Sequence, residues 1–309
     1  NREGSKPGDG QLSAVALMDA RSIAASAVAG GYLTSAEEMA DDYVAPRHVY
    51  DDAIYRSRIY QGFGQPDAST ELVYGPNIKP WPALPALADH ILLQIAARIM
   101  DPVTTTDELI PSGETSSLRS NPLRLAEFTL SRRDPAYVGR AKATAALARA
   151  QAEGTIPQEL ASVYEAARSI EGYADVTPAD IEIGSVIYAV RPGDGSAREQ
   201  AASCQRVLGG LANICSQYAT KRYRSNVMNW GMVPFQMEGE PDFQIGDWVF
   251  VPDARVAVSG DGQDILAYII GGSGAPRRIA LTIAAMTDEE KAIVKAGCLI
   301  NYNRAKRES

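Results

Sequence analysis

The ten residues from 193 to 202 constrain the fold of this chain more than any other segment. They read Gly-Asp-Gly-Ser-Ala-Arg-Glu-Gln-Ala-Ala, so a flexible Gly-x-Gly turn gives way at once to helical composition. The preceding run, Ser185–Val190, is short, apolar and partly β-branched, which predicts a buried strand. We therefore expect Ser196 and Arg198 on a strand-to-helix turn of an α/β fold.

Such a turn suits an anion. The start of a helix leaves backbone N–H groups without partners and carries the positive end of the helix dipole. An arginine adds two parallel hydrogen bonds to a carboxylate or phosphate. No His or Lys lies near Ser196 in the sequence to activate it, so its alkoxide would depend on the surrounding N–H groups. A Gly-x-Gly by itself is common, and the following Ser-x-Arg makes the signal more specific.

Composition excludes several classes of protein. The 309 residues, 45% hydrophobic and 22% charged, indicate a soluble globular chain of about two domains. The net charge of −8 argues against a nucleic-acid partner or an anionic membrane surface. No run approaches the ~20 apolar residues of a membrane span. The polar N-terminus lacks a signal-peptide core and an initiator methionine, which fits a fragment or a processed form.

Cysteine and histidine offer little chemistry. The spacings of Cys204, Cys215 and Cys298 match no zinc or cluster motif, so we expect buried thiols in a reducing cytoplasm and no metal site. His48 falls in a loop and His90 in an expected helix. A structural role is favoured for both.

The pattern along the chain is mixed α and β. Residues 14–18 predict a strand that leads into a helix N-capped by Asp19, and residues 41–82 predict an extended connector. Residues 84–99 predict a helix, or a strand followed by a helix. Further helices are expected at 122–130, 139–152, 157–170 and after the Thr287/Glu290 capping box, and further strands at 181–190, 211–214, 243–251 and 265–270.

Two more polar clusters could carry chemistry. In Thr105-Thr106-Asp107 the β-branched neighbours would hold the carboxylate stiffly, although a helix N-cap or Asx-turn explains the same residues. The loop 112–121 is rich in hydroxyl groups and carries Arg119. It reads either as a solvated loop or as an anion-contacting one.

Together these segments resemble the aconitase superfamily. Residues 193–202, followed by Leu-Gly-Gly at 208–210, resemble its Gly-x-Gly-Ser-Ser-Arg-Glu-His-Ala motif, and 105–107 resemble its Thr-Thr-Asp-His-Ile element. Arg119, twelve residues after Asp107, falls where that family carries a substrate-binding arginine. Residues 229–235 look like its Asn…Gly-Leu-Leu-Pro-Leu segment. The four elements occur in the family's order, and the chain looks closest to bacterial aconitase-like hydratases.

The resemblance implies a fold and a division of the chain. The fold would be α/β, a swivelling β/β/α domain of the aconitase or isopropylmalate dehydratase small-subunit type, with a mixed central sheet and flanking helices. Residues 1–40 would be the C-terminal tail of a preceding cluster-bearing α/β domain, 41–83 an extended interdomain linker, and 84–309 the swivel domain.

It also implies a reaction, the reversible dehydration of a hydroxy-polycarboxylate by a hydro-lyase. Ser196 would abstract the proton α to a carboxylate, and Asp107 would belong to the acid–base network. Arg119 and Arg198 would bind substrate carboxylates.

Thr106 and Ala197 would also lie against the substrate. A [4Fe–4S] cluster in the parent enzyme would act as Lewis acid, with its ligands outside this chain. The partners would be the substrate and the upstream cluster-bearing domains, and the fragment alone would be inactive.

Departures from the family pattern bear on the substrate. Ala197 replaces the second serine of the motif, Gln200 its histidine, and Glu108 the histidine after Thr-Thr-Asp. None of the three cysteines fits the family's cluster motif. Asn1-Arg2 resembles the end of a family Asn-Arg element.

Two alternatives remain open. The run 106–111 also resembles the Thr-Asp-x-Ile-Ile-Pro of the isopropylmalate dehydratase small subunit, although those subunits are usually shorter. A non-catalytic module that binds carboxylates with the same fold is the other alternative.

Overall fold

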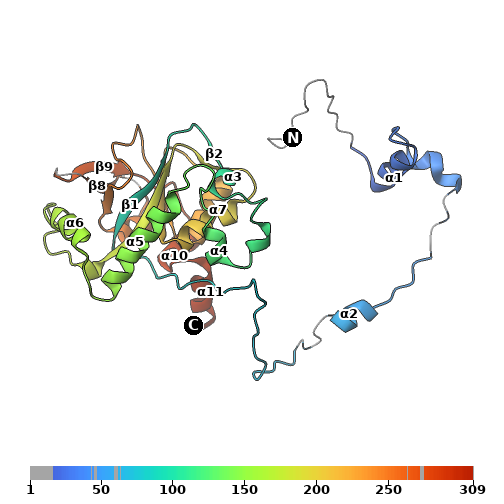
Figure 1. Cartoon of the computed structure of the whole chain (residues 1–309), viewed down its shortest axis with the longest axis horizontal. Helices are drawn as coiled ribbons and strands as arrows, with labels where there is room; N and C mark the ends of the chain where they lie inside the picture. The colour runs from blue at the N-terminus through green and yellow to red at the C-terminus, as the bar shows by residue number, and fades with distance from the viewer. Residues whose placement is uncertain are drawn as a thin grey trace. The chain divides into compact units, whose positions relative to one another are not determined.

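The computed structural model describes residues 17–42, 44, 47–58, 62, 64–262, 264–271 and 275–308. The chain forms two compact units, which meet in the sequence between Glu71 and Leu72 (Figure 1). Each unit is described by itself below.

The first unit contains short helices. α1 spans Ala20–Val28, and the Asp19 carboxylate accepts from the backbone N–H groups of Arg21 and Ser22, as its predicted N-cap role requires. A 3₁₀ turn covers Ala36–Asp42, and α2 covers Ala53–Arg58 within the expected connector. Most of the predicted strand at 14–18, and the Asn1-Arg2 pair, lie outside the described residues.

The second unit is built on a seven-stranded mixed sheet in the described part of the chain. The strand order is β6-β5-β3-β1-β7-β8-β9. The first four strands are parallel, and β7, β8 and β9 continue the sheet antiparallel. The bounds are β1 His90–Ile99, β3 Ile181–Ala189, β5 Gly210–Cys215, β6 Val233–Gln236, β7 Trp248–Val251, β8 Ile265–Ile270 and β9 Arg277–Leu281.

The prediction of a helix within 84–99 was wrong, and the strand alternative holds only in part. Residues 90–99 form the central strand β1, with His90 as its first residue, and no helix follows it before residue 104. Seven of its ten residues are apolar, and by composition alone they would suit either a buried strand or a buried helix. Pairing on both sides, with β3 and β7, decides for the strand because it satisfies the backbone groups of a segment buried on both faces.

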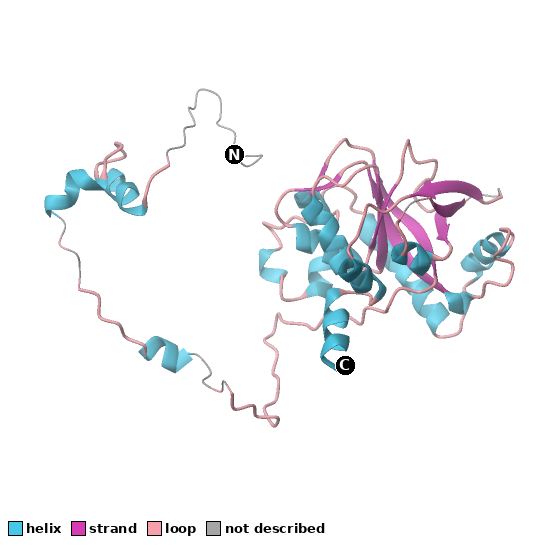
Figure 2. Ribbon diagram, turned by 180° about the vertical axis from the view of Figure 1, so that it is seen from behind, coloured by secondary structure: helices cyan, strands magenta, loops and turns pink. Residues whose placement is uncertain are grey.

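Helices connect the parallel strands and flank the sheet (Figure 2). The crossover from β1 to β3 carries α3 to α6, whereas α7 joins β3 to β5 and α8 joins β5 to β6. The bounds are α3 Thr106–Leu109, α4 Pro122–Ala126, α5 Tyr137–Ala152, α6 Gln158–Arg168, α7 Arg198–Val207, α8 Lys221–Asn229, α9 Ala254–Ser259, α10 Asp288–Lys295 and α11 Leu299–Glu308. None of these is long and apolar enough to cross a bilayer.

The core lies on both faces of the sheet. On one face Ile91, Leu93 and Ile95 of β1 pack with apolar side chains of α8, α9 and α10. On the other face Ala97 and Ile99 pack with α4, α5 and α7. The strand register shifts between Ile95 and Ala97, so the alternation of faces changes there. The mixed α/β class with a central mixed sheet and flanking helices is confirmed.

A second, two-stranded sheet lies beyond the ends of β1 and β3. β2, Thr104–Thr105, pairs in parallel with β4, Pro192–Asp194. β4 is the segment that leads from the predicted buried strand into the glycine turn.

Gly193 in β4 should be irreplaceable for steric reasons. Its φ is +96°, and a Cβ there would lie 2.2 Å from the ring of Tyr223, which is fully buried. We expect Gly193→Ala to lower the free energy of unfolding by roughly 3 kcal/mol, from left-handed strain plus overpacking. Urea unfolding measures the loss.

Gly154→Ala is the matched control. Gly154 has φ +82° and nothing within 4 Å of an added Cβ, so only the conformational cost of about 1 kcal/mol applies. Equal losses in the two variants would contradict the packing argument.

Candidate functional site

The two-stranded sheet brings the two predicted motifs together. Thr105 pairs with Asp194, which places the Thr105–Asp107 element beside the glycine turn. Gly195 has φ +125°, and a Cβ on it would lie 2.3 Å from the Thr106 hydroxyl oxygen. Only a residue without a side chain allows this approach. Segments almost ninety residues apart thus form one surface.

The turn ends in an open helix N-terminus. α7 begins at Arg198, its N-cap is Ala197, and no side chain caps the first-turn N–H groups. The first helical hydrogen bond runs from the N–H of Ala201 to the carbonyl of Ala197. Ser196 is exposed directly before this end. The predicted strand-to-helix turn is confirmed, with β4 as an added short strand within it.

Arg198 is half-buried at the same end of α7. Its Nε is buried, and no acceptor lies within hydrogen-bond distance of it among the described residues. A buried guanidinium N–H without a partner is costly, and an incoming carboxylate would satisfy it. The uncapped N–H groups of α7 and this guanidinium together offer the hydrogen-bond donors that an anion requires, and this cluster of donors is called the anion cradle below.

Asp107 lies in the first turn of α3, one residue after Thr106. Thr105 caps this helix in a reciprocal capping box with Glu108, so the N-cap interpretation of the motif holds for Thr105. The Asp107 carboxylate accepts from the N–H of Ser112 and pairs with the Arg132 guanidinium at 2.8 Å. Its side chain remains 54% exposed, so the carboxylate is held in place yet open to a substrate.

Arg119 lies in the turn after a 3₁₀ segment, Ser116–Leu118, and is exposed. Its charge acts on the carboxylate of Glu199, the second residue of α7. The side chains of Ser203 and Trp230 hydrogen-bond to that carboxylate, but burial outweighs them and raises the pKa of Glu199. Arg119 therefore lies near enough to the first turn of α7 for its charge to oppose part of this rise in pKa.

The extended segment before β1 contacts the residues around Arg119 and Trp230. The N–H of Lys79 donates to the carbonyl of Ser120 at 3.0 Å, next to Arg119. Trp81 packs on Trp230 with ring centroids 4.3 Å apart. The extended segment is thus attached to the loop that carries Arg119 and to Trp230 at the end of α8.

Two residues of this region were missed at the level of sequence. Glu199 belongs to the glycine-turn motif, but no role was predicted for it, because its partial burial near Trp230 depends on tertiary packing. Arg132, which also pairs with Glu114, lies 25 residues from Asp107, and no local pattern marks that pair. Ser196, Ala197, Arg198, Thr106 and Asp107 lie on or directly beside the elements that the β2–β4 pairing and α7 bring together. Arg119 lies outside these elements, at the end of the Ser116–Leu118 segment.

The residues described do not fit an iron–sulfur cluster. Cys204, Cys215 and Cys298 are buried free thiols, and no three metal-binding side chains gather in the described part of the chain. Burial raises the pKa of the Cys204 and Cys215 thiols to about 12, which disfavours the thiolate that a metal requires.

Comparison with known proteins bears on the family. No family model matches the chain. Aconitate hydratase A of Bradyrhizobium diazoefficiens is 27% identical over 169 residues, 49% of this chain and 17% of that protein, so the chain matches about a sixth of the relative's length. A 3-isopropylmalate dehydratase (LeuD) structure from Methanocaldococcus jannaschii aligns with TM-score 0.42 and 20% identity, over 71% of this chain and 96% of that one. The chain is similar in sequence to an aconitase, and the predicted relationship to the aconitase superfamily is confirmed.

Glu199 should make stability depend on pH. Its folded-state pKa lies above its unfolded value of about 4.3, so the buried carboxyl favours the protonated form. The free energy of unfolding of the wild type should therefore fall, relative to Glu199→Gln, as pH rises from below 4 through the raised pKa. Urea unfolding at a series of pH values between about 3.5 and 7 measures the difference in unfolding free energy between the two proteins.

Glu171→Gln, at an exposed position, is the control and should follow the wild type. Parallel pH profiles for wild type and Glu199→Gln would refute the assigned burial effect.

Proposed function

We propose that this chain is the C-terminal, swivel-domain part of an aconitase-like hydro-lyase that hydrates and dehydrates a hydroxy-polycarboxylate. The observation that carries the proposal is the β2–β4 pairing, which puts the Thr106–Asp107 element and the Ser196–Arg198 turn on one surface. The order of the motifs and the sequence similarity to an aconitate hydratase support it.

Ser196 is proposed as the base. Its hydroxyl lies at the uncapped start of α7, where free N–H groups and the helix dipole favour an alkoxide. In the dehydration direction the oxygen takes the proton from the carbon α to a substrate carboxylate. The same oxygen returns the proton in hydration.

The two arginines are proposed as carboxylate clamps. Arg198 has a buried Nε without an acceptor among the described residues, and Arg119 lies near enough to the same end of α7 for its charge to act on Glu199. Two carboxylates held at fixed points would orient the α-proton toward Ser196.

The remaining site residues have subsidiary roles in this proposal. Asp107, held by Arg132, serves the acid–base network. Thr106 was expected to contact the substrate, but its side chain is buried against Gly195, so its proposed role is to hold the glycine turn in place. Ala197 lies against the substrate and gives the site one hydroxyl fewer than the family motif carries. This difference concerns which hydroxy acid is accepted.

The cluster implied by the family resemblance is assigned to upstream domains. Residues 1–40 are proposed as the tail of a cluster-bearing domain, 41–83 as the linker and 84–309 as the swivel domain. Without those domains the chain is inactive. A cytoplasmic location suits its free buried thiols.

Ser196→Ala in the complete enzyme tests the catalytic assignment. Removing the base should lower kcat by about 10³-fold or more, within the range of acid–base catalysis and substrate positioning. Cluster absorbance should stay unchanged, because Ser196 is no ligand. Turnover of citrate, isocitrate and aconitate is the measurement.

Ser117→Ala, an exposed serine on the loop that precedes Arg119, is the matched control and should keep normal turnover. Near-normal turnover of Ser196→Ala would overturn the assignment. Tricarboxylate binding by calorimetry without any turnover of the complete wild-type protein would favour the non-catalytic module.

The chain of 309 residues should bind no stoichiometric iron on its own. The physical reason is that its thiols are buried, that no three metal-binding side chains gather in the described part of the chain, and that burial raises the pKa of the Cys204 and Cys215 thiols. Iron and sulfide analysis after anaerobic reconstitution measures this. One cluster per chain would contradict the assignment of the cluster to upstream domains.

A further inference from the structure

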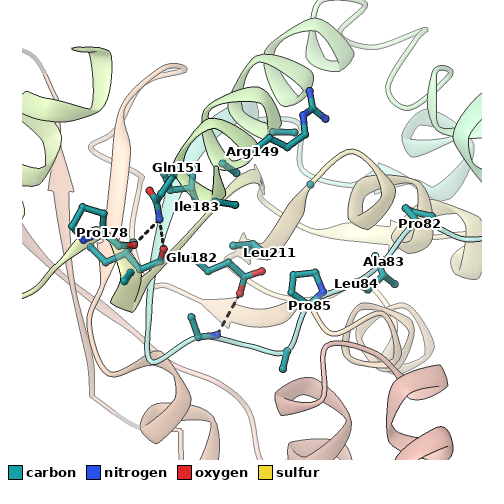
Figure 3. Close-up of a pocket in the computed structure, with 18 of the residues that line it drawn as sticks. Pro82, Ala83, Leu84, Pro85, Arg149, Gln151, Pro178, Glu182, Ile183 and Leu211 are labelled. Atoms are coloured by element: carbon teal, nitrogen blue, oxygen red, sulfur yellow. Dashed lines mark hydrogen bonds between the residues drawn. The ribbon is translucent and has the colours of Figure 1, made fainter. Parts of the chain in front are cut away.

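A pocket of about 830 Å³ lies at the end of α7 opposite to Ser196. Its walls come from the extended segment 82–88, the second half of α5, the start of β3 and the last turn of α7 (Figure 3). None of the six predicted site residues lines it. The pocket is therefore a separate feature from the anion cradle.

A buried pair of charges lies in this pocket. The side chain of Glu182 is 15% exposed and that of Arg206 is 4% exposed. In Figure 3 the Glu182 carboxylate projects between Leu211 and Pro85. Two buried opposite charges are normally joined by direct hydrogen bonds, because each buried charge is costly without them.

Glu182 and Arg206 make no direct hydrogen bond with each other. The shortest Arg206–Glu182 distance is 3.9 Å, beyond hydrogen-bond range. Among the described residues, the Glu182 carboxylate accepts a single long bond of 3.4 Å, from the N–H of Ala88. Arg206 donates to the carbonyls of Gly210 and Pro85, yet its buried Nε finds no acceptor among the described residues. One acceptor and one donor thus lack good partners at the wall of a pocket.

We propose that this pocket is a second binding site, for a small neutral molecule with an apolar body and a head group that both donates and accepts hydrogen bonds. A primary carboxamide is the simplest such group. Its NH₂ would donate to Glu182, and its carbonyl would accept from the Arg206 guanidinium.

Charged ligands fit less well. A ligand carboxylate would meet the Glu182 carboxylate, whose pKa is already raised by burial. An ammonium would meet Arg206, with Arg149 also on the pocket wall. A neutral donor–acceptor satisfies both orphan groups without adding a buried charge.

The walls suit an apolar body. Most of the lining side chains are alanine, proline or branched aliphatic residues, and the volume falls within the ~300–1,000 Å³ typical of small-molecule sites. The polar groups of Gln151 are engaged elsewhere, with the carbonyls of Pro178 and Ile181 and with Tyr164. Specificity in the head group therefore rests on Glu182 and Arg206.

Three probes with the same apolar body and different head groups test the charge preference. 4-Methylpentanamide, 4-methylpentanoate and 4-methylpentylammonium are titrated into the full chain at pH 7 and followed by calorimetry or by amide chemical shifts. We expect saturable binding of the carboxamide and at least ten-fold weaker binding of the two ions. No saturable binding of the carboxamide, or equal binding of the three probes, would overturn the proposal.

Ala148→Phe locates the site. Ala148 is a half-buried residue of α5 on the pocket wall, and a phenyl group there should abolish carboxamide binding. Ala143→Phe, at an exposed position of the same helix outside the pocket, should bind like the wild type. Unchanged binding in Ala148→Phe would refute the location.

Glu182→Gln tests the head-group contact. It removes the carboxylate while keeping the shape, so carboxamide affinity should fall at least five-fold. Thermal unfolding of each variant shows whether it is folded, and if Glu182→Gln does not fold, the Ala148→Phe and Ala143→Phe pair decides alone. Full affinity in folded Glu182→Gln would overturn the proposed contact.

Discussion

The parallel pairing of Thr104–Thr105 with Pro192–Asp194 is the contact on which the candidate site depends. It is only a few residues long, yet it lies just beyond the ends of β1 and β3, the two central parallel strands. Those strands are held next to each other in a buried sheet. The segments that follow them, β2 and β4, therefore also lie side by side. The absence of a side chain at Gly195 then lets the turn close against Thr106.

α7 links the two polar regions of the domain. Its first turn carries Arg198 and Glu199 beside the glycine turn, and its last turn carries Arg206 beside Glu182. The middle of the helix is buried through Ala201, Ala202 and Cys204. An exposed helix could tilt freely, but this one is held by apolar packing, so the positions of its two ends are fixed relative to the sheet.

Local signals were read well from the sequence where neighbouring residues decide the structure. The caps at Asp19, Thr105 and Thr287 are each made by side chains within three residues of the N–H groups they satisfy. The strand, glycine turn and helix around Ser196 are likewise local. By contrast, residues 90–99 are apolar on both faces, so no periodicity distinguishes strand from helix, and the pairing with β3 and β7 settles it.

The sequence by itself therefore determined the α/β class, the helix caps, the strand-to-helix turn around Ser196 and the resemblance to aconitases. Tertiary structure alone decided that Thr106 touches Gly195, that Arg132 holds Asp107, that Arg119 acts on Glu199, and that Glu182 and Arg206 share a pocket. The physical reason is the distance along the sequence over which each kind of interaction acts. Caps and turns depend on hydrogen bonds between near neighbours, whereas these contacts join segments that only the packed sheet brings together.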